Sequence, residues 1–413
     1  MSSNRHFPIH SSTACKSKWN WSTLYLATGT TSSCHRVEKN HIPIDNFNSF
    51  HNLPNKLNDR ELMLKGQWPT GGCSYCKNIE EVGGVSDRQY HLHIPNAIPD
   101  ELLIDSTSLV VTPKIVEVYL NNICNLSCVY CHETFSSKIE TENNKFGKIQ
   151  IVEENLKFNG NLLNRTERKT YFVYFCKWLE QNIHSLERLQ ILGGEPFYQK
   201  EFKDVLKIIK ANGHRNLTLN IVSNLMVSDL YEQIAEIKEI ILSKKLKKLS
   251  IIASIDGWGN EQEYARYGLQ MQTFLNNFEF LVQEKWIELG INQTITALTL
   301  KSIKDLYNYI NLKKNNRKIN INFSLVMGHE YLNPKIFGKN FWVNDMKEIL
   351  QLMPESNETE KITKNYMEGI FSYISSSEQN IEQIQNLKLY LDEIDRRRNL
   401  DWRKTFPYLD VKI

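Results

Sequence analysis

The sequence predicts an α/β fold with a mostly parallel sheet that is either open or partly closed into a barrel. From residue 114 onward, short apolar runs alternate with longer amphipathic segments. The alternation recurs six times, and strands that alternate with helices usually form a parallel sheet. The chain has 413 residues, of which 41% are hydrophobic, so it can bury a large core.

The expected strands are the short apolar runs at residues 114–120, 188–192, 217–223, 249–255, 291–300 and 319–326. The expected helices are the amphipathic segments at residues 165–183, 202–211, 231–242, 272–289 and 303–313. Residues 133–160 form a polar insertion for which the pattern predicts no element. The last segment, 341–413, reads as helical and charged.

Residues 1–95 form a different region, rich in cysteine, histidine and turn residues but with little sustained periodicity. Such a small, loop-rich domain would bury too little apolar surface to be stable unaided. Pro95 and Pro99 mark a linker after it. The prediction is therefore three parts: a cysteine-rich domain at 1–95, an α/β core at 110–330 and a helical extension at 331–413.

Composition excludes several classes of function. Lys and Arg number 50 against 47 Asp and Glu, a formal charge of +3, which indicates neither nucleic-acid nor membrane binding. The longest apolar run, 171–176, is far shorter than the roughly 20 residues of a membrane span. With no stretch of signal-peptide length at the start, we expect a cytoplasmic protein. Arg396, Arg397 and Arg398 are interpreted as a solvated helix face rather than a binding patch.

The eight cysteines carry most of the functional information, and all but Cys176 lie in the first third of the chain. A disulfide framework would be unusual in a chain of this length without a secretion signal. Clustered thiols in a reducing compartment favour a soft metal or an iron–sulfur cluster. Cys176, flanked by aromatic residues in a helical stretch, is interpreted as a core residue.

Cys124, Cys128 and Cys131 follow the first core strand with the spacing CxxxCxxC. Three thiolates can bind three irons of a [4Fe–4S] cluster and leave the fourth iron open as a chemical site. The alternatives are a zinc site or coincidence. Zinc prefers four ligands in pairs, and His132 lies too close to Cys131 to complete the usual spacing.

This motif, with aromatic Tyr130 before the last cysteine, resembles that of the radical S-adenosylmethionine superfamily. Further landmarks follow at the ends of later strands: the Gly193-Gly194-Glu195 segment, the Ser223-Asn224 pair, and Ser254-Ile255-Asp256-Gly257 with Arg266 beyond it. Ligands bind at the carboxyl edge of parallel sheets, which is where these residues are expected to meet.

The resemblance implies a partial (β/α)6 barrel that binds a [4Fe–4S] cluster and S-adenosylmethionine. It implies that Glu195 contacts the methionine amino group, that Ser254 meets the ribose and that Arg266 pairs with the methionine carboxylate. It assigns Tyr130, Gly193, Gly194, Ser223, Asn224 and Asp256 to the same cofactor site. An electron donor such as flavodoxin or ferredoxin would serve as partner.

A second constellation comprises Cys15, Cys34, Cys73 and Cys76. Its first half consists of Cys15, a span that ends in Gly29, and Cys34 five residues later. This spacing resembles that of the auxiliary-cluster modules of SPASM and twitch radical enzymes. Four cysteines can ligate a second [4Fe–4S] cluster, although here the module precedes the barrel rather than following it. A structural zinc ribbon also fits the CxxC spacing.

The resemblance favours an enzyme that oxidises or crosslinks a peptide or protein, with the auxiliary cluster accepting an electron from the substrate radical. A dehydrogenase of a small molecule is the alternative within the same superfamily. The alternative from another class is a non-catalytic binding protein whose fold is stabilised by zinc or by a cluster. In such a protein the Gly193-Gly194-Glu195 and Ser254-Ile255-Asp256-Gly257 segments would have no role.

Overall fold

The computed structural model describes residues 11–81, 83, 86–89, 108–151, 161–314 and 317–410. Pro95 and Pro99, which we interpret as a linker, lie outside these ranges. The division of the chain near residue 95 therefore stays a prediction. None of the helices in the described ranges is long and apolar enough to cross a membrane.

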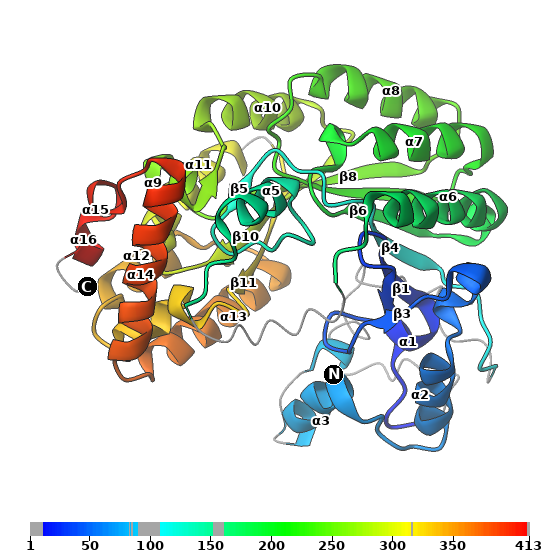
Figure 1. Ribbon diagram of the computed structural model, residues 1–413, viewed down its shortest axis with the longest axis horizontal. Helices are drawn as coiled ribbons and strands as arrows, with labels where there is room; N and C mark the ends of the chain where they lie inside the picture. Colours follow the sequence, from blue (N-terminus) through cyan, green and yellow to red (C-terminus); the bar gives the residue numbers. More distant parts are fainter. Residues whose placement is uncertain are drawn as a thin grey trace.

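A nine-stranded sheet forms the centre of the molecule (Figure 1). The strands from β11 to β1 are parallel to their neighbours, whereas β2 and β3 run antiparallel at the other edge. All six expected strands are present, and they neighbour one another in chain order. In spatial order the strands are β11 (Ile319–Leu325), β10 (Glu288–Ile295), β8 (Lys248–Ser254), β7 (Thr218–Ser223), β6 (Arg188–Leu192), β4 (Ile115–Tyr119), β1 (Trp21–Tyr25), β2 (Thr30–Ser32) and β3 (Asn40–His41).

Strand β1 is the main departure from the expected architecture, because the cysteine-rich segment extends the sheet of the core. It pairs in parallel with β4 along its whole length, from Trp21 opposite Ile115 onward. Polar residues of β1 are buried and bonded, since the Thr23 hydroxyl donates to Glu117 at 3.2 Å and Ser22 bonds His51 at 2.7 Å. A strand that buries polar side chains lacks the apolar run by which strands are recognised in sequence.

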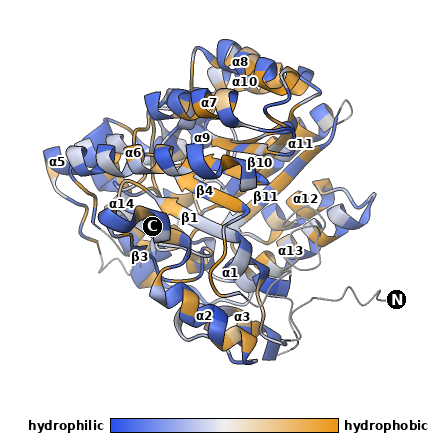
Figure 2. Cartoon of the chain, turned by 90° about the vertical axis from the view of Figure 1, so that its right-hand side faces the viewer, coloured by the Kyte–Doolittle hydropathy of each residue, from blue (hydrophilic) through white to orange (hydrophobic). Residues whose placement is uncertain are grey.

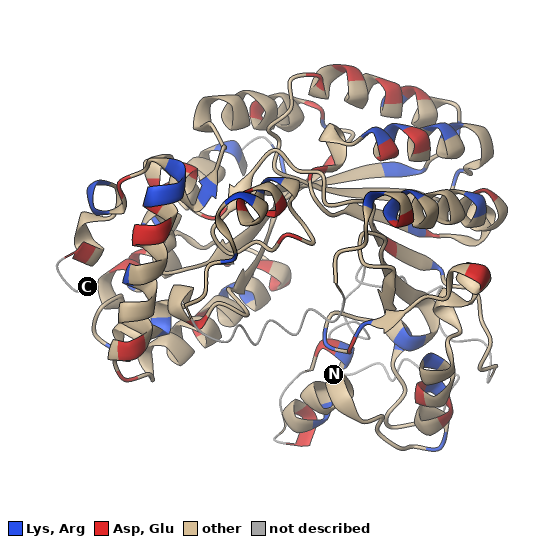
Figure 3. Ribbon diagram, viewed as in Figure 1, with Lys and Arg blue, Asp and Glu red and all other residues tan. Residues whose placement is uncertain are grey.

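Five helices cover the sheet where helices are expected: α6 (Arg165–Asn182), α7 (Lys200–Asn212), α8 (Leu230–Leu242), α10 (Met271–Gln283) and α11 (Ile303–Lys314). Helix α10 ends at Gln283, earlier than expected, because the chain turns to begin β10 at Glu288. Figure 1 shows α6, α7 and α8 stacked in a row along the sheet, and Figure 3 shows charges of both signs interspersed on them.

Residues 343–410 are mainly helical, as expected: α12 (Val343–Leu352), α13 (Glu358–Ser375), α14 (Ile381–Arg398), α15 (Trp402–Thr405) and α16 (Pro407–Asp410). Trp342 and Trp402 are almost wholly buried and anchor this segment. The remaining elements used below are α1 (Lys16–Asn20), α3 (Ser74–Glu81), α5 (Ser137–Phe146), α9 (Gly259–Ala265), β5 (Ser127–Cys128) and β9 (Arg266–Tyr267).

The two faces of the sheet differ in polarity. On β6 and β7, Leu189, Ile191, Leu219 and Ile221 are fully buried, and the residues between them are half-exposed. Figure 2 shows hydrophobic colour concentrated on central strands and hydrophilic colour on much of the outer helices. On the other face a polar row crosses neighbouring strands in register, with Glu117 buried at one end of it: Glu117, Gln190, Asn220 and Ser250.

Candidate active site

The loop after β4 carries the CxxxCxxC cysteines and is paired to a distant segment. Its two-residue strand β5 runs antiparallel to β9, with Cys128 opposite Arg266. The Val129 N–H donates to the Ala265 carbonyl at 2.9 Å, which extends this pairing. Arg266, predicted from sequence to contact a bound cofactor, therefore lies beside Cys128.

The three thiols of this loop lie close enough to influence one another. Burial, with a contribution from the Cys128 thiol, raises the pKa of Cys124 to about 12. The same two causes raise the pKa of Cys131 well above its usual value. Burial also raises the pKa of Cys128, although the Arg266 guanidinium opposes the shift. Within the described residues, no three Cys, His, Asp or Glu side chains form a group arranged to hold one metal ion.

Gly193 and Gly194, directly after β6, allow the backbone to pass close to the cysteine loop. Both have positive φ, +84° and +57°. A Cβ atom on Gly194 would lie 2.0 Å from the carbonyl oxygen of Ile123, a contact no side chain can make. The next residue, Glu195, donates its N–H to that same carbonyl at 2.9 Å. Gly194 is therefore required for packing against the residue before Cys124, and Gly193 for packing against Tyr119 of β4.

Glu195 is fully buried and joins the ends of β6 and β7. Its carboxylate accepts hydrogen bonds from the Ser223 hydroxyl at 2.7 Å, the Asn224 N–H at 2.6 Å and the Phe197 N–H at 3.2 Å. Burial raises the pKa of Glu195 to about 7 despite these donors. Three of the residues that the sequence assigns to one cofactor thus form one hydrogen-bonded group.

Asn224 connects this group to the cysteine loop. Its side-chain amide donates to Asn125 Oδ1 at 2.9 Å and lies 3.9 Å from the sulfur of Cys124. The carboxyl ends of β6 and β7 therefore meet the loop that follows β4, as expected for neighbouring parallel strands.

A second polar group forms beyond β8. Arg266 donates to both carboxylate oxygens of Asp256, each at 2.8 Å, and the Tyr130 hydroxyl donates to the same carboxylate at 2.6 Å. Although burial opposes its charge, the Asp256 carboxylate raises the pKa of Arg266 well above its usual value. Ser254, largely buried at the end of β8, pairs in register with Asn292.

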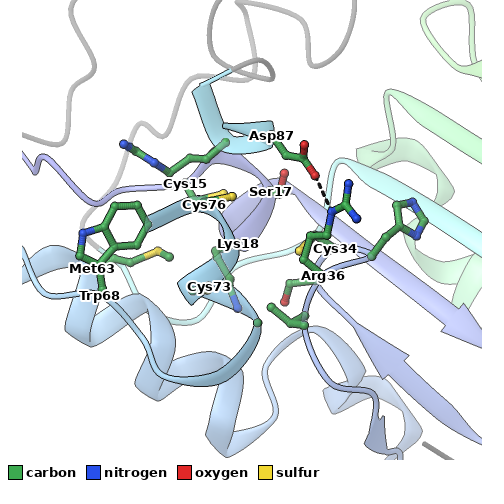
Figure 4. A pocket seen from close by; sticks show the side chains of 15 residues that line it. Cys15, Ser17, Lys18, Cys34, Arg36, Met63, Trp68, Cys73, Cys76 and Asp87 are labelled. Atoms are coloured by element: carbon green, nitrogen blue, oxygen red, sulfur yellow. Dashed lines mark hydrogen bonds and ion pairs between the residues drawn. The ribbon is translucent and has the colours of Figure 1, made fainter. Parts of the chain in front are cut away.

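The four remaining predicted ligands come together in a separate pocket (Figure 4). Cys15 precedes α1, Cys34 follows β2, Cys73 directly precedes α3 and Cys76 lies within it. Burial raises the pKa of Cys73 to about 12. Four cysteines that are far apart in the sequence thus line one pocket.

Lys18 is a buried cation of this pocket, which Arg36 and Arg88 also line. Its ammonium pairs with Asp59, and in Figure 4 its side chain lies beside Cys73. Although burial opposes its charge, the Cys73 thiol and the Asp59 carboxylate raise the pKa of Lys18. A buried cation beside four thiols would favour their ionised form.

The segment after Cys34 reaches across the molecule. His35 lies 3.6 Å from the carboxylate of Glu117 on β4, and the Arg36 guanidinium lies 3.8 Å from the sulfur of Met327, which follows β11. Strands β4 and β11 are the first and last of the six-strand core. One short segment therefore contacts both a side chain of β4 and the residues that follow β11.

The interpretation of the arginine run as a solvated face is wrong for two of its three members. Arg396 is exposed and pairs with Glu393, but the side chains of Arg397 and Arg398 are only 2% and 3% exposed. Both face Glu142 of α5. Helical spacing could not reveal this, because α5 lies in the segment for which the sequence predicted no element.

Comparisons with known proteins find partial likenesses among solved structures. Native anSMEcpe with bound AdoMet is 15% identical, with a TM-score of 0.34, and the match covers 57% of this chain and 58% of that one. His6-tagged anSMEcpe with bound AdoMet is also 15% identical, with a TM-score of 0.35 and 57% of each chain covered. The chain thus matches less than two thirds of either protein. No protein-family model and no curated protein matches it.

Proposed function

We propose that the chain is a radical S-adenosylmethionine enzyme whose active site is the cysteine loop after β4. The observation that carries the proposal is the pairing of Cys128 with Arg266. A cluster ligand and the residue that the sequence assigns to the methionine carboxylate come from distant parts of the chain and lie side by side. Asn224, assigned to the same cofactor, lies 3.9 Å from the sulfur of Cys124 on the other side of the loop.

The donor set suits the proposed cluster. Three thiols on one loop, with polar donors around them, match the soft ligands that bind iron–sulfur clusters. Cys124, Cys128 and Cys131 would hold a [4Fe–4S] cluster. When bound, it supplies the electron that cleaves S-adenosylmethionine to methionine and a 5′-deoxyadenosyl radical, which then abstracts a substrate hydrogen.

The chain's own residues would bind and orient the cofactor. A guanidinium has five N–H donors, and Asp256 accepts from two nitrogens of Arg266, so donors remain for a methionine carboxylate. Glu195 already accepts from the Ser223 hydroxyl and the Asn224 backbone N–H, so we propose that it acts by orienting the Ser223 side chain and the Asn224 backbone as well as by accepting from an ammonium. Burial of all of these side chains excludes water from the reaction.

We further propose that Cys15, Cys34, Cys73 and Cys76 hold an auxiliary [4Fe–4S] cluster that accepts an electron from the substrate radical. Support comes from the shared pocket and from the buried ammonium of Lys18, which would offset the negative charge of four thiolates. The substrate would be a peptide or protein, on the strength of the resemblance, with a small molecule as the alternative. A flavodoxin or ferredoxin would supply electrons.

Anaerobic reconstitution followed by metal and product analysis tests both proposals. Two clusters of four irons give about eight irons per chain, whereas a zinc-stapled protein would bind one or two zinc ions. With S-adenosylmethionine and dithionite, 5′-deoxyadenosine should form in the reconstituted enzyme. Zinc in place of iron, or no 5′-deoxyadenosine from an iron-loaded protein, would overturn the proposed function.

A further inference from the structure

Helix α14 of the C-terminal segment packs against the loop that carries the three cysteines. Two of its side chains, Tyr390 from the middle of the helix and Arg398 from its last residue, donate hydrogen bonds to backbone carbonyls of that loop. The carbonyls belong to Ser127 and Val129, the two residues that flank Cys128. We propose that α14 holds Cys128 in the conformation that binds the cluster and that Arg398 is the principal positioning residue. The ligand role of Cys128 rests on the proposed function, whereas its restraint by α14 does not.

Arg398 makes four contacts that together fix the loop on one side. Its guanidinium donates to the Ser127 carbonyl at 2.9 Å and to both carboxylate oxygens of Glu142 at 2.9 and 3.3 Å. It also lies over the ring of Tyr267, 5.2 Å from the ring centre. Tyr267 is the residue opposite Ser127 in the β5–β9 pair, so one side chain contacts both strands of the pair.

Tyr390 secures the other flank of Cys128. Its hydroxyl donates to the Val129 carbonyl, and its ring packs on Tyr331 with 4.9 Å between ring centres. Tyr390 is only 7% exposed, so water competes little for this hydrogen bond. Cys128 thus lies between two residues whose carbonyls are both held by α14.

The loop needs this support because its own pairing is short. β5 and β9 contribute two residues each, and an isolated pair of strands is at best marginally stable even when it is longer. Three thiolates that bind one cluster must be held in a fixed arrangement before the cluster enters, since a loose ligand set loses affinity to ordering entropy. Restraint from α14 supplies that order from outside the loop.

Thiol reactivity in the metal-free full chain tests the proposal without any cofactor. The iron-free protein is alkylated with iodoacetamide, and the rate at each cysteine is followed by peptide mass spectrometry. Arg398→Ala should raise the rate at Cys128 by about tenfold, because the hydrogen bonds that it removes from the loop outweigh the loss of a positive charge that favours the thiolate. Tyr390→Phe, which deletes one hydroxyl and keeps the ring packing, should raise it by about threefold.

Two controls separate local restraint from general loosening. Arg396→Ala removes an exposed arginine of the same helix that pairs with Glu393, and it should leave the Cys128 rate unchanged. Cys176 on α6 should react at the native rate in every variant, and the midpoint of thermal unfolding should fall by no more than a few degrees for Tyr390→Phe. Arg398→Lys, which keeps the charge near Glu142 but cannot make the same set of hydrogen bonds, should fall between Arg398→Ala and the native protein.

A cluster-specific readout completes the test in a background where the four N-terminal cysteines are alanine. There the iron bound per chain and the electron paramagnetic resonance signal of the reduced cluster report on the loop alone. Arg398→Ala should bind less iron and broaden the signal. Unchanged Cys128 rates in both Arg398→Ala and Tyr390→Phe would overturn the proposal. If the native protein binds no iron but the variants still raise the alkylation rate of Cys128, only the proposed function is overturned.

Discussion

Arg266 and Asp256 form a buried, two-point ion pair that connects the cysteine loop to the end of β8. Both hydrogen bonds are 2.8 Å long, and the Asp256 side chain is fully buried. Arg266 pairs with Cys128 through the backbone at the same time. Arg266 therefore links Cys128, a proposed cluster ligand, to the carboxyl end of β8.

Replacing Arg266 with alanine should weaken S-adenosylmethionine binding by about ten- to a hundredfold, because a charge-assisted pair with the methionine carboxylate is lost. The structure adds a second expectation. Asp256 would keep a buried charge without its cation, which costs about 3–5 kcal/mol of folding stability. Calorimetric titration and urea unfolding measure the two effects.

The double variant Arg266→Ala/Asp256→Asn separates the loss of cofactor affinity from the loss of folding stability. Neutralising Asp256 should restore much of the stability without restoring affinity for the cofactor. If the single variant binds S-adenosylmethionine as tightly as the native protein, Arg266 has only the structural role.

Replacing Cys124, Cys128 and Cys131 together with alanine should abolish formation of 5′-deoxyadenosine and leave about half of the bound iron, because only one of two proposed clusters is lost. Iron analysis and chromatography of the reaction measure both quantities. Cys176→Ala, which changes a partly buried cysteine on the helix face of the sheet, is the matched control and should retain both. Cleavage activity in the triple variant would place the active site elsewhere.

The Glu195 carboxyl should make stability fall as the pH rises from about 4.5 to 7. Its pKa is raised to about 7 by burial, so between these values the folded chain binds a proton that the unfolded chain has released. The stability that this group contributes is complete below pH 4.5 and is lost as the pH rises through 7. The predicted loss is about 3 kcal/mol across this range.

Urea unfolding of the native protein and Glu195→Gln at several pH values measures this effect. Glutamine does not titrate, so the slope that Glu195 contributes should disappear in the variant. The comparison uses the slopes, because glutamine also changes the hydrogen bonds to Ser223 and Asn224. Parallel pH profiles for the two proteins would contradict the shifted pKa.

Replacing Cys73 and Cys76 with alanine should leave cleavage of S-adenosylmethionine largely intact and stop product formation, if the four-cysteine pocket holds the electron acceptor. The region around α3 should become sensitive to protease, since ligands in this pocket would tie it to α1 and β2. Strand β1 should stay protected, because it pairs along its length with β4. If the variant forms product at the native rate, the four-cysteine pocket does not hold the electron acceptor.

Deleting residues 1–107 should produce an aggregating fragment rather than a free barrel. The deletion removes β1 and leaves the edge of β4, a largely buried strand, with unpaired backbone groups. Light scattering and size-exclusion chromatography measure the outcome. A monomeric fragment with native helix content would mean that the core folds independently of the cysteine-rich segment.

The sequence by itself determined the six core strands, their helices and the thiols with the chemistry to bind clusters. These features are local, because alternation of apolar runs reports burial over a few residues and CxxxCxxC spacing lies on one loop. The six strands lie side by side in chain order in the structure, as successive strands of a parallel sheet commonly do.

Only the tertiary structure decided how these parts meet. Strand β1 escaped detection because its polar residues Ser22 and Thr23 are buried and find partners, such as Glu117, only in the folded chain. The convergence of the four N-terminal cysteines, and the contact of Arg398 with Ser127, depend on the path of the chain between distant segments. No local pattern encodes such a path, because the free energy of these contacts appears only once the sheet has brought both partners together.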